Sequence, residues 1–459
     1  MLEEAIAHYH ELLDAETAEA SQICLTDGLR ERNLFFGNRP LATVLRPRFV
    51  TAEQYDLLRS ACGLAATAMR RLAAAMLIDP SIQADLQLTA GEQALIAMDP
   101  GYEEPSAHSR MDTFLTLDGS SLRFVEYNAE SPAAIAYEDE LADIFLHLPV
   151  MQRFGERYVA AKLPARHQLL QTLLDAWQAF GNTRAPLIAI VDWKGLPTHS
   201  EFLLFQQYFH ERGLEAIICS PDELEWSAGQ LYARLADRRV PVDLVYKRVL
   251  TSEFLTHYGD HALEHPLVQA YASGKTCVVN SFRAKLLHKK SIFALLTDDR
   301  FQHLFTPEQQ AAITKHVPWT RLVRPGSTTY EGATIDLLSW VSANQERLLL
   351  KPNDEYGGKG ILIGWETDAA TWAQGLKDAL HSPSVVQERV EIAYEEYPSV
   401  IDGQLQIGRR LVDSDPFLFG SEVTGCLTRL STVTLLNVTA GGGSSIPMFV
   451  LRKREAEVK

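Results

Sequence analysis

The stretch Arg123-Phe124-Val125-Glu126-Tyr127-Asn128 alternates between apolar and polar side chains. Met111 to Leu117 alternates in the same way, and the turn residues Asp118-Gly119-Ser120-Ser121 separate the two segments, so a β-hairpin is predicted. Side chains two positions apart on a strand face the same side, which puts Glu126 and Asn128 on one face. Together with Asp112 from the partner strand, they offer the oxygen ligands that Mg²⁺ prefers. Taken alone, the pattern fits an exposed polar face of an antiparallel sheet equally well.

The length of the hairpin loop decides whether Asp112 shares that face. A two-residue loop at Gly119-Ser120 would set Asp112 opposite Tyr127, and Glu126 and Asn128 would then face the other way. A loop of three or five residues would bring Asp112 onto their face. We expect such an odd loop, with Gly119 relieving a bulge. A structure with Asp112 on the opposite face from Glu126 would rule out the three-ligand site.

The composition indicates an acidic enzyme-like chain. It has 459 residues, of which 46% are hydrophobic, and its net charge is -16. This length predicts two to four structural units. A chain this acidic is a poor candidate for sequence-independent binding of nucleic acid, which needs a basic face. We therefore expect no nucleic-acid partner.

The cysteines and the N-terminus indicate a reducing compartment. The five cysteines are dispersed and form no CxxC pair, which favours small buried side chains over disulfides or a zinc site. The acidic start, Met1 to Ala5, does not have the pattern of a signal peptide, and no apolar run approaches the ~18 residues of a membrane span. We expect a cytoplasmic protein without a membrane partner.

The periodicity of apolar residues divides the chain. Residues 1–100 are predicted to be largely helical, with Thr51 as an N-cap. Residues 186–280 predict α/β units, and residues 281–350 are helical again, with one helix from Lys285 to Leu296. Strands and glycine-rich loops follow from 345 to 451. The predicted α/β strands are Leu187–Val191, Glu215–Cys219, Val242–Tyr246 and Thr276–Asn280, with a helix from His199 to Gly213.

A glycine-rich segment follows an apolar strand in Leu348-Leu349-Leu350-Lys351-Pro352-Asn353-Asp354-Glu355-Tyr356-Gly357-Gly358-Lys359-Gly360-Ile361. Glycines let backbone N–H groups approach phosphate oxygens, and Lys351 and Lys359 would add charge. The segment is not a Walker A motif. On the loop alone, a β-hairpin with a glycine turn is at least as good an explanation.

Three weaker segments accompany it. Val385-Val386-Gln387-Glu388-Arg389-Val390 suits a hinge beside a planar base, although an edge strand would look the same. The basic run Ser281 to Ser291 could reach a phosphate or form a solvated helix face. Thr424 to Leu430, with Arg429, precedes the glycine-rich Asn437 to Gly443, where an arginine could stabilise phosphoryl charge or a strand pair could end in a turn.

Together these segments resemble the circularly permuted ATP-grasp family, which includes the synthetase part of glutathionylspermidine synthase. The resemblance covers roughly residues 35–450 and is most specific at Arg110-Met111-Asp112, Val125 to Ser131, and Lys351-Pro352 with its glycines. In an ordinary ATP-grasp chain the metal ligands follow the glycine loop, whereas Glu126 and Asn128 precede it here. The implied fold class is α/β (α+β), a circularly permuted ATP-grasp fold with a Rossmann-like pre-ATP-grasp domain.

The resemblance implies three regions: an N-terminal helical region with the metal-binding half (1–180), a substrate domain (181–282) and the nucleotide-binding half (283–459). It implies ATP and Mg²⁺ as cofactors. The implied Mg²⁺ ligands are Asp112, Glu126 and Asn128, and the arginines at the transferred phosphoryl group are Arg110 and Arg429. The implied nucleotide contacts are Lys290, Lys351, the lid Gly357-Gly358-Lys359-Gly360, and Gln387 with Glu388 and Val390. Lys289 fits nearly as well as Lys290.

The implied activity is a ligation in which ATP activates a carboxylate as an acyl phosphate and an amine then displaces the phosphate. The small-molecule substrates could be amino acids, peptides or polyamines. There is no trace of the cysteine amidase domain of the bifunctional synthase, and Asn437 to Gly443 is closer to an uncharacterised bacterial branch, so the substrates and the oligomeric state stay open. The alternatives are a regulatory nucleotide-binding protein and an ATP-dependent phosphotransferase. A Rossmann dehydrogenase is weaker, since no GxGxxG follows the strand at Leu187.

Overall fold

The computed structural model describes residues 1–236, 238–434 and 443–454. Positions 437–442 of the predicted glycine-rich segment Asn437 to Gly443 lie outside this range.

A nine-stranded sheet joins the two ends of the chain. Its main path runs in the order β20-β21-β23-β22-β4-β5, and β24 pairs with β23, β3 and β6. Almost every pairing is antiparallel, and β24 runs parallel to β3. The strands are β3 (Arg48–Val50), β4 (His108–Leu115), β5 (Leu122–Asn128), β6 (Tyr158–Ala161), β20 (Tyr394–Ile401), β21 (Gln404–Val412), β22 (Asp415–Phe419), β23 (Glu422–Ser431) and β24 (Ser444–Lys453).

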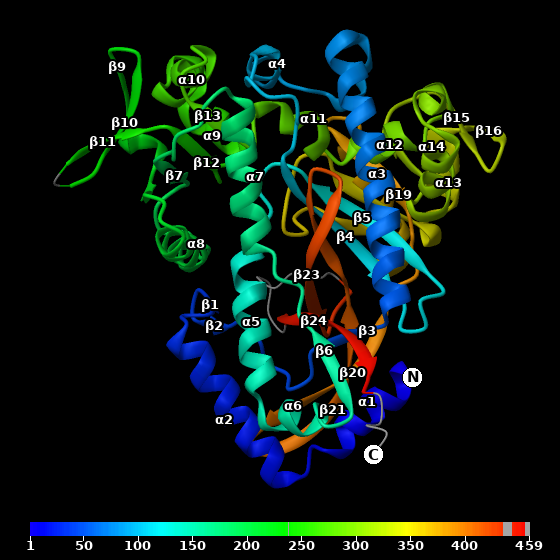
Figure 1. Cartoon of the computed structure of the whole chain (residues 1–459). Coiled ribbons are helices and arrows are strands. Elements are labelled where there is room, and N and C mark those ends of the chain that lie inside the picture. The colour runs from blue at the N-terminus through cyan, green and yellow to red at the C-terminus, as the bar shows by residue number, and fades with distance from the viewer. Residues whose placement is uncertain (237, 435–442, 455–459) are drawn as a thin grey trace.

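Helices from the first third of the chain cover this sheet (Figure 1). They are α1 (Leu2–Glu11), α2 (Ala15–Glu31), α3 (Ala52–Ile78), α5 (Ile135–His147) and α6 (Pro149–Phe154), with the 3₁₀ helix η1 (Pro80–Leu86) after α3 and the small hairpin β1 (Phe35–Phe36) and β2 (Arg39–Pro40) before it. The helix α4 (Ala90–Ala97) lies away from this sheet, at the top of Figure 1. Thr51 caps α3 as predicted, in a capping box with Gln54. By length and composition α3 could cross a membrane, but half of its most apolar window is buried, where it shares a core with β4 and β5.

A four-stranded parallel sheet forms the second unit, at the upper left of Figure 1. Its strand order is β13-β12-β7-β8, and the four strands lie within a residue or two of the predicted ones. They are β7 (Ile188–Val191), β8 (Ala216–Cys219), β12 (Leu244–Lys247) and β13 (Cys277–Val279), with helices α7 (Arg166–Ala179), α8 (His199–Glu211), α9 (Thr251–Tyr258) and α10 (Pro266–Ala272) and short helices η2 (Pro221–Glu223) and η3 (Gly259–Glu264). A three-stranded antiparallel sheet was not predicted: β9 (Leu224–Ser227), β10 (Gln230–Arg234) and β11 (Arg239–Val242).

The third unit is an antiparallel sheet in the order β14-β19-β17-β18. These strands are β14 (Thr320–Leu322), β17 (Leu348–Pro352), β18 (Leu362–Ile363) and β19 (Ser384–Glu388). Around them are the hairpin β15 (Ser327–Tyr330) and β16 (Ala333–Asp336), helices α11 (Lys285–His288), α12 (Ser291–Leu296), α13 (Pro307–His316), α14 (Leu337–Ala343) and α15 (Ala369–Ala379), and 3₁₀ helices η4 (Phe282–Ala284), η5 (Asp299–Leu304), η6 (Gln345–Arg347) and η7 (Gly364–Glu366).

The prediction of one helix from Lys285 to Leu296 was wrong, because the helix breaks at Lys289 and Lys290. Lys289 has an extended backbone (ψ 140°). Asn353 holds the break: its backbone oxygen accepts from Lys290 N (2.9 Å), and its side-chain Oδ1 accepts from Ser291 N (2.8 Å). Apolar periodicity runs through the break, but it does not show this long-range contact.

Asn280, at the end of β13, joins the parallel sheet to the hairpin β4–β5. Its buried Oδ1 accepts from the backbone N–H groups of Ala107 (2.7 Å) and His108 (3.2 Å). Its Nδ2 donates to the backbone oxygens of His108, Ala129 and Glu130 (2.7–3.0 Å). One side chain therefore fixes where both hairpin strands meet the edge of the parallel sheet.

Candidate nucleotide and metal site

The hairpin β4–β5 places the predicted metal ligands together. Asp112 lies opposite Glu126 and Arg110 lies opposite Asn128, so the prediction that Asp112 shares their face is confirmed. The expected cause was wrong. Leu115 pairs with Leu122, so the loop has an even number of residues. The register shifts instead on β5, where Val125 is left without a partner in the ladder.

The bulge at Val125 could have been found in the sequence. Leu122, Phe124 and Tyr127 pack into the core under α3, and their spacing of two and then three positions is that of a strand with one extra residue. The freed carbonyl oxygen of Val125 accepts a hydrogen bond from Lys351 Nζ (3.0 Å). The irregularity thus links the hairpin to the strand that leads into the glycine-rich segment.

Lys351 is buried between two sheets. Its Nζ also donates to Gln387 Oε1 (2.7 Å), and Gln387 Nε2 donates to Thr320 Oγ1 (3.1 Å). Burial lowers the pKa of Lys351 to about 8, although the Glu126 carboxylate favours the charged form. The ammonium group of Lys351 is therefore held at a fixed point with little hydration, where it would attract a phosphate oxygen strongly.

Two arginines and three aspartates form a buried network beside the hairpin. Arg110 binds Asp112 through two nitrogens (2.7 and 3.1 Å). Arg429 contacts Asp112 Oδ2 (2.8 Å), Asp413 and Asp415 Oδ2 (2.8 Å). Burial opposes ionisation, but the guanidinium groups of Arg110 and Arg429 lower the pKa of Asp112 to about 2. Burial raises the pKa of Asp415 well above its usual value, since two cations do not compensate three carboxylates.

The helix break separates the two candidate lysines. Lys290 Nζ donates to Glu126 Oε1 (2.8 Å) and to the backbone oxygen of Glu355. Lys289 turns away to Glu92 (3.0 Å) and Asp354 (3.4 Å). Of the pair, Lys290 is thus the one beside the predicted metal ligands.

A buried ion cluster holds the start of the glycine-rich segment. The fully buried Lys285 Nζ contacts Asp354 (2.6 Å), Glu92 (3.6 Å) and Glu130 (3.9 Å). Asp354 precedes Gly357 by three positions, so the segment is tied at its base and becomes exposed towards its tip at Lys359. Lys359 Nζ lies over the ring of Tyr356 (4.7 Å to its centre) and not in the site.

Most of the predicted site residues line one cavity of about 170 Å³. They are Arg110, Asp112, Glu126, Asn128, Lys351, Gly357, Gly358, Gln387, Glu388, Val390 and Arg429. Lys290, Lys359 and Gly360 do not line it. The sequence analysis missed Asp413, Trp365, Thr434 and an apolar set consisting of Phe114, Val125, Leu349, Ile361, Ile363 and Ile392. Phe114 could have been found, because it lies two positions from Asp112 on the same face.

A second, larger cavity of about 580 Å³ adjoins the first. The two share Arg110, Asn128, Gly357 and Arg429. The arginines therefore stand between a smaller cavity beside the glycine-rich segment and a larger one that reaches the parallel sheet.

The donor set fits a hard cation in part. In the described part of the chain, Glu126 Oε2 and Asn128 Oδ1 accept no hydrogen bond, and both residues face the cavity. Asp112 is saturated by Arg110, Arg429 and Asn128 Nδ2 (2.9 Å). Within the described residues, no group of three or more His, Cys, Asp and Glu side chains is placed to hold a metal. Glu126 and Asn128 each have an oxygen that could bind the cation directly. Asp112 would first have to lose a hydrogen bond from Arg110 or Arg429.

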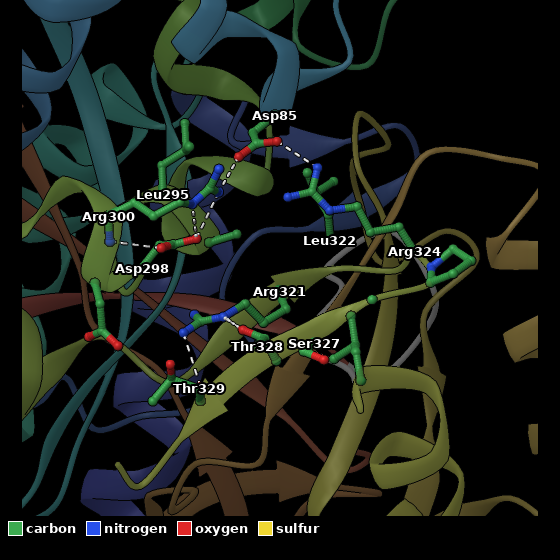
Figure 2. A pocket seen from close by; sticks show the side chains of 15 residues that line it. Asp85, Leu295, Asp298, Arg300, Arg321, Leu322, Arg324, Ser327, Thr328 and Thr329 are labelled. Atoms are coloured by element: carbon green, nitrogen blue, oxygen red, sulfur yellow. Dashed lines mark hydrogen bonds and ion pairs between the residues drawn. The ribbon is translucent and has the colours of Figure 1, made fainter. Parts of the chain in front are cut away.

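A third cavity, of about 360 Å³, lies elsewhere and contains no predicted site residue (Figure 2). Asp85 there accepts from Arg324 Nη1 (2.7 Å) and pairs with Arg300, which also pairs with Asp298. Arg321 donates to Thr328 Oγ1 (2.7 Å) and to backbone oxygens. Arg300 and Arg324 pair with the carboxylates, so we interpret the group as a tie between η1, η5 and the segment that follows β14.

Comparison with known proteins gives a match in fold and none in sequence. No family model and no curated protein sequence matches the chain. The structure is similar to that of a glutathione synthetase-like effector (GSS30) from Globodera pallida in its apo form, with a TM-score of 0.60 and 12% identity over 94% of this chain and 96% of that one.

Two weaker similarities are to a putative gamma-glutamylcysteine synthetase from Methylobacillus flagellatus KT and to a RimK domain protein ATP-grasp from Sphaerobacter thermophilus. The first has a TM-score of 0.44 at 12% identity over 88% and 89% of the two chains, and the second 0.27 at 16% over 57% and 89%. The match to the effector spans almost the whole of both chains. The chain shares the overall fold of this glutathione synthetase-like protein.

Proposed function

We propose that this protein is an ATP- and Mg²⁺-dependent carboxylate–amine ligase that forms an amide bond through an acyl phosphate. The observation that carries the proposal is the meeting of Lys351, Arg110 and Glu126 at one cavity closed by Gly357 and Gly358. These residues come from two distant parts of the chain, the hairpin β4–β5 and the strand β17. Cations bind phosphate oxygens directly, and a carboxylate binds them through Mg²⁺. The likeness of the fold to a glutathione synthetase-like protein supports the same class of reaction.

The chain's own residues would do the work by placing charge. Lys351 and Lys290 neutralise phosphate oxygens, and Gln387, Glu388 and Val390 lie beside the base. Arg110 and Arg429 face the phosphoryl group as it moves to the carboxylate, where fixed cations stabilise the charge of the transition state. Mg²⁺ held by Glu126 and Asn128, with Asp112 once an arginine has moved, would add charge neutralisation at the phosphates.

The glycine-rich segment would act as a lid. A cavity of about 170 Å³ is smaller than the ~300–1,000 Å³ usual for a ligand site, so a nucleotide requires Gly357 and Gly358 to move outward. The contacts of Lys290 with the backbone of Glu355, and of Tyr356 Oη with Glu253 (3.0 Å), would break in that step. Closure over the nucleotide would exclude water, which otherwise hydrolyses an acyl phosphate.

We further propose that the fold is the circularly permuted form, with residues 181–282 as its Rossmann-like pre-ATP-grasp domain. The support is the order of the chain: Glu126 and Asn128 precede Lys351 and its glycines. The nine-stranded sheet, built from residues before 162 and after 393, is what a permuted chain needs to close its fold.

The test is substrate-dependent release of ADP, measured with Glu126→Ala and Lys351→Ala. Each change should lower kcat/KM by about 100-fold or more, because Lys351→Ala removes a fixed cation at the phosphates and Glu126→Ala removes a ligand of the Mg²⁺ that neutralises them. Lys377→Ala, on the exposed surface of α15, is the matched control and should not change the rate. Full activity in either site variant would contradict the proposal.

Mass analysis of the product separates the remaining functions. A new amide supports the ligase. A phosphate ester would indicate a phosphotransferase, and ADP binding without any product a regulatory protein. A panel of amino acids, small peptides and polyamines, each with and without a carboxylate partner, supplies the substrates.

A further inference from the structure

The larger cavity, of about 580 Å³, has mostly apolar walls. Phe36 and Leu41, at the small hairpin β1–β2, form one part of the wall, and Tyr137 of α5 forms another. Leu196, Pro197 and Leu250 complete it from loops that follow strands of the parallel sheet. A volume of this size is within the usual range of a small-molecule site.

Two carboxylates, Asp192 and Glu253, interrupt the apolar lining, together with the three arginines Arg110, Arg248 and Arg429. Both oxygens of Glu253 are engaged, one by Trp193 Nε1 (3.2 Å) and one by Tyr356 Oη (3.0 Å). Asp192 follows β7 at the carboxyl end of the parallel sheet, an edge where ligands bind in sheets of this kind. Its Oδ1 accepts from Trp193 N (2.9 Å), and within the described residues its Oδ2 has no hydrogen-bond partner. Asp192 therefore offers an open acceptor in apolar surroundings.

The charged side chains around Asp192 do not occupy its carboxylate, so a cationic ligand could bind there. Arg248 and Lys247 are near enough to stabilise its carboxylate, and Glu253 is near enough to oppose it, but none forms a hydrogen bond to it. Arg248 instead donates to Pro132 O (2.7 Å) and Tyr246 Oη (3.1 Å), and Lys247 to Val249 O (3.2 Å). Burial raises the pKa of Asp192 to about 6, so the group is ionised at pH 8.

We infer that this cavity binds the amine substrate, and that this substrate has a single ammonium group, held by Asp192, on an apolar body that lies against Phe36, Leu41 and Leu196. The inference rests on the proposed function, because the cavity opens at Arg110 and Arg429, where the activated carboxylate would stand.

The apolar walls of the larger cavity favour an amine with an apolar body over a polyamine. An apolar body gains about 25 cal/mol per Å² that it loses to water. A polyamine carries further ammonium groups, and the described lining offers no second carboxylate oxygen that is free to pair with them, so burying them against the apolar wall is costly. The carboxylate of Asp192 therefore favours an amine that carries one positive charge.

The experiment measures binding to the full-length protein without ATP at pH 8, by saturation-transfer NMR and calorimetry. The probes are hexylamine, its uncharged analogue hexan-1-ol, and spermidine. Hexylamine should bind most tightly. Asp192→Asn should weaken hexylamine by about 10-fold or more and leave hexan-1-ol unchanged, because only the charge-assisted contact is lost. Phe36→Ala should weaken both six-carbon probes.

Two matched controls accompany these variants. Asp260→Asn makes the same change at an exposed aspartate of η3, and Leu203→Ala shortens an exposed side chain of α8. Neither should alter binding. Equal affinity of wild type and Asp192→Asn for hexylamine, or tighter binding of spermidine than of hexylamine, would overturn the inference.

A second arm adds ATP and the carboxylate panel. If hexylamine binds through Asp192 but no amine gives an amide, the proposed ligase function fails while the assignment of the cavity to an apolar amine stands. If spermidine supports amide formation and hexylamine does not, the inference fails and the ligase function stands.

Discussion

The carboxylate of Asp112 accepts four hydrogen bonds from other residues of the site. Two come from nitrogens of Arg110, one from Arg429 and one from Asn128. The phosphates of a nucleotide would compete for the same two guanidinium groups. Binding of the nucleotide and release of Asp112 towards a cation would therefore favour each other.

Acid stability should reveal His108, a buried residue at the start of β4. Burial, with Arg248 nearby, lowers its pKa to about 3 from an unfolded value near 6.5. Between these two pKa values the unfolded chain binds a proton at His108 and the folded protein does not. The contribution of His108 to the free energy of unfolding is therefore fully present above pH 6.5 and is lost as the pH falls towards 3. We expect His108→Gln to remove about 2 kcal/mol of the stability lost between pH 7 and pH 5.

Urea unfolding at the two pH values measures this difference. His261→Gln, at an exposed histidine, is the control and should keep the full pH dependence of the wild type. His265 and His288 have lowered pKa values for the same reason, so His108→Gln should flatten the dependence only in part. An unchanged dependence in His108→Gln would show that another group causes the acid sensitivity.

At this scale the sequence was informative where residues lie close together along the chain. Alternation along β5 was enough to predict that Glu126 and Asn128 share a face, whereas the face of Asp112 depended on a bulge that was expected near Gly119 and lies at Val125. Asp413 and Asp415 escaped prediction, because their contact with Arg429 depends on how β22 and β23 pair. An isolated aspartate carries no local pattern that distinguishes a buried ion pair from a solvated one.

Among the elements, the break between α11 and α12 matters most for the site. A continuous helix would carry Lys290 round its axis with Lys289, and the contact with Glu126 would be lost. Asn353 prevents this through its bonds to Lys290 and Ser291, and its Nδ2 donates to Leu86 O (3.0 Å). The buried side chain of Asn353 therefore prevents α11 and α12 from joining into one helix, and Lys290 stays beside Glu126.

We expect Asn353→Ala to cost about 2 kcal/mol or more of stability, because it leaves buried backbone groups without partners. It should also weaken nucleotide binding, since Lys290 is released. Denaturation and calorimetric titration with an ATP analogue measure the two effects. Asn344→Ala is the control, because that side chain donates only within its own turn, to Trp340 O (2.8 Å). Unaltered nucleotide affinity in a folded Asn353→Ala protein would argue against a role for Lys290.

Element by element, the parallel strands were predictable because each is a short apolar run between turn residues. The antiparallel sheet β9–β11 was not, since its strands are half-exposed and contain no continuous apolar run. The long strands β20 and β21 were predicted only as a region, because residues 345–451 alternate too irregularly to show register.

For the molecule as a whole, a buried ion pair joins residues near the two ends of the chain. Arg46 Nη2 contacts Glu395 Oε2 (2.9 Å), and Arg48 Nη2 lies 3.5 Å from Glu395 Oε1. The guanidinium of Arg46 also lies over the ring of Tyr397, 4.0 Å from its centre. Within the described residues, Glu395 is thus the one carboxylate that pairs with these two fully buried arginines.

We expect Glu395→Ala to lower the free energy of unfolding by about 3–5 kcal/mol, because it strands two buried charges. Urea denaturation of the full-length protein measures the loss. Glu396→Ala, at the next position with an exposed side chain, should change stability by less than about 0.5 kcal/mol. Similar losses in the two variants would mean that the arginines find other partners.

The strand β24 has a consequence for synthesis. Met448 pairs beside Arg48 and Val450 beside Val50, and on its other edge β24 meets β6 at residues 158–161. During translation, β3 and β6 leave the ribosome long before their partner exists. Their edges stay unpaired until residues 444–453 emerge, and exposed strand edges invite aggregation. Slow translation of the later part of the gene should therefore lower the yield of folded protein, and a chaperone that covers strand edges should restore it.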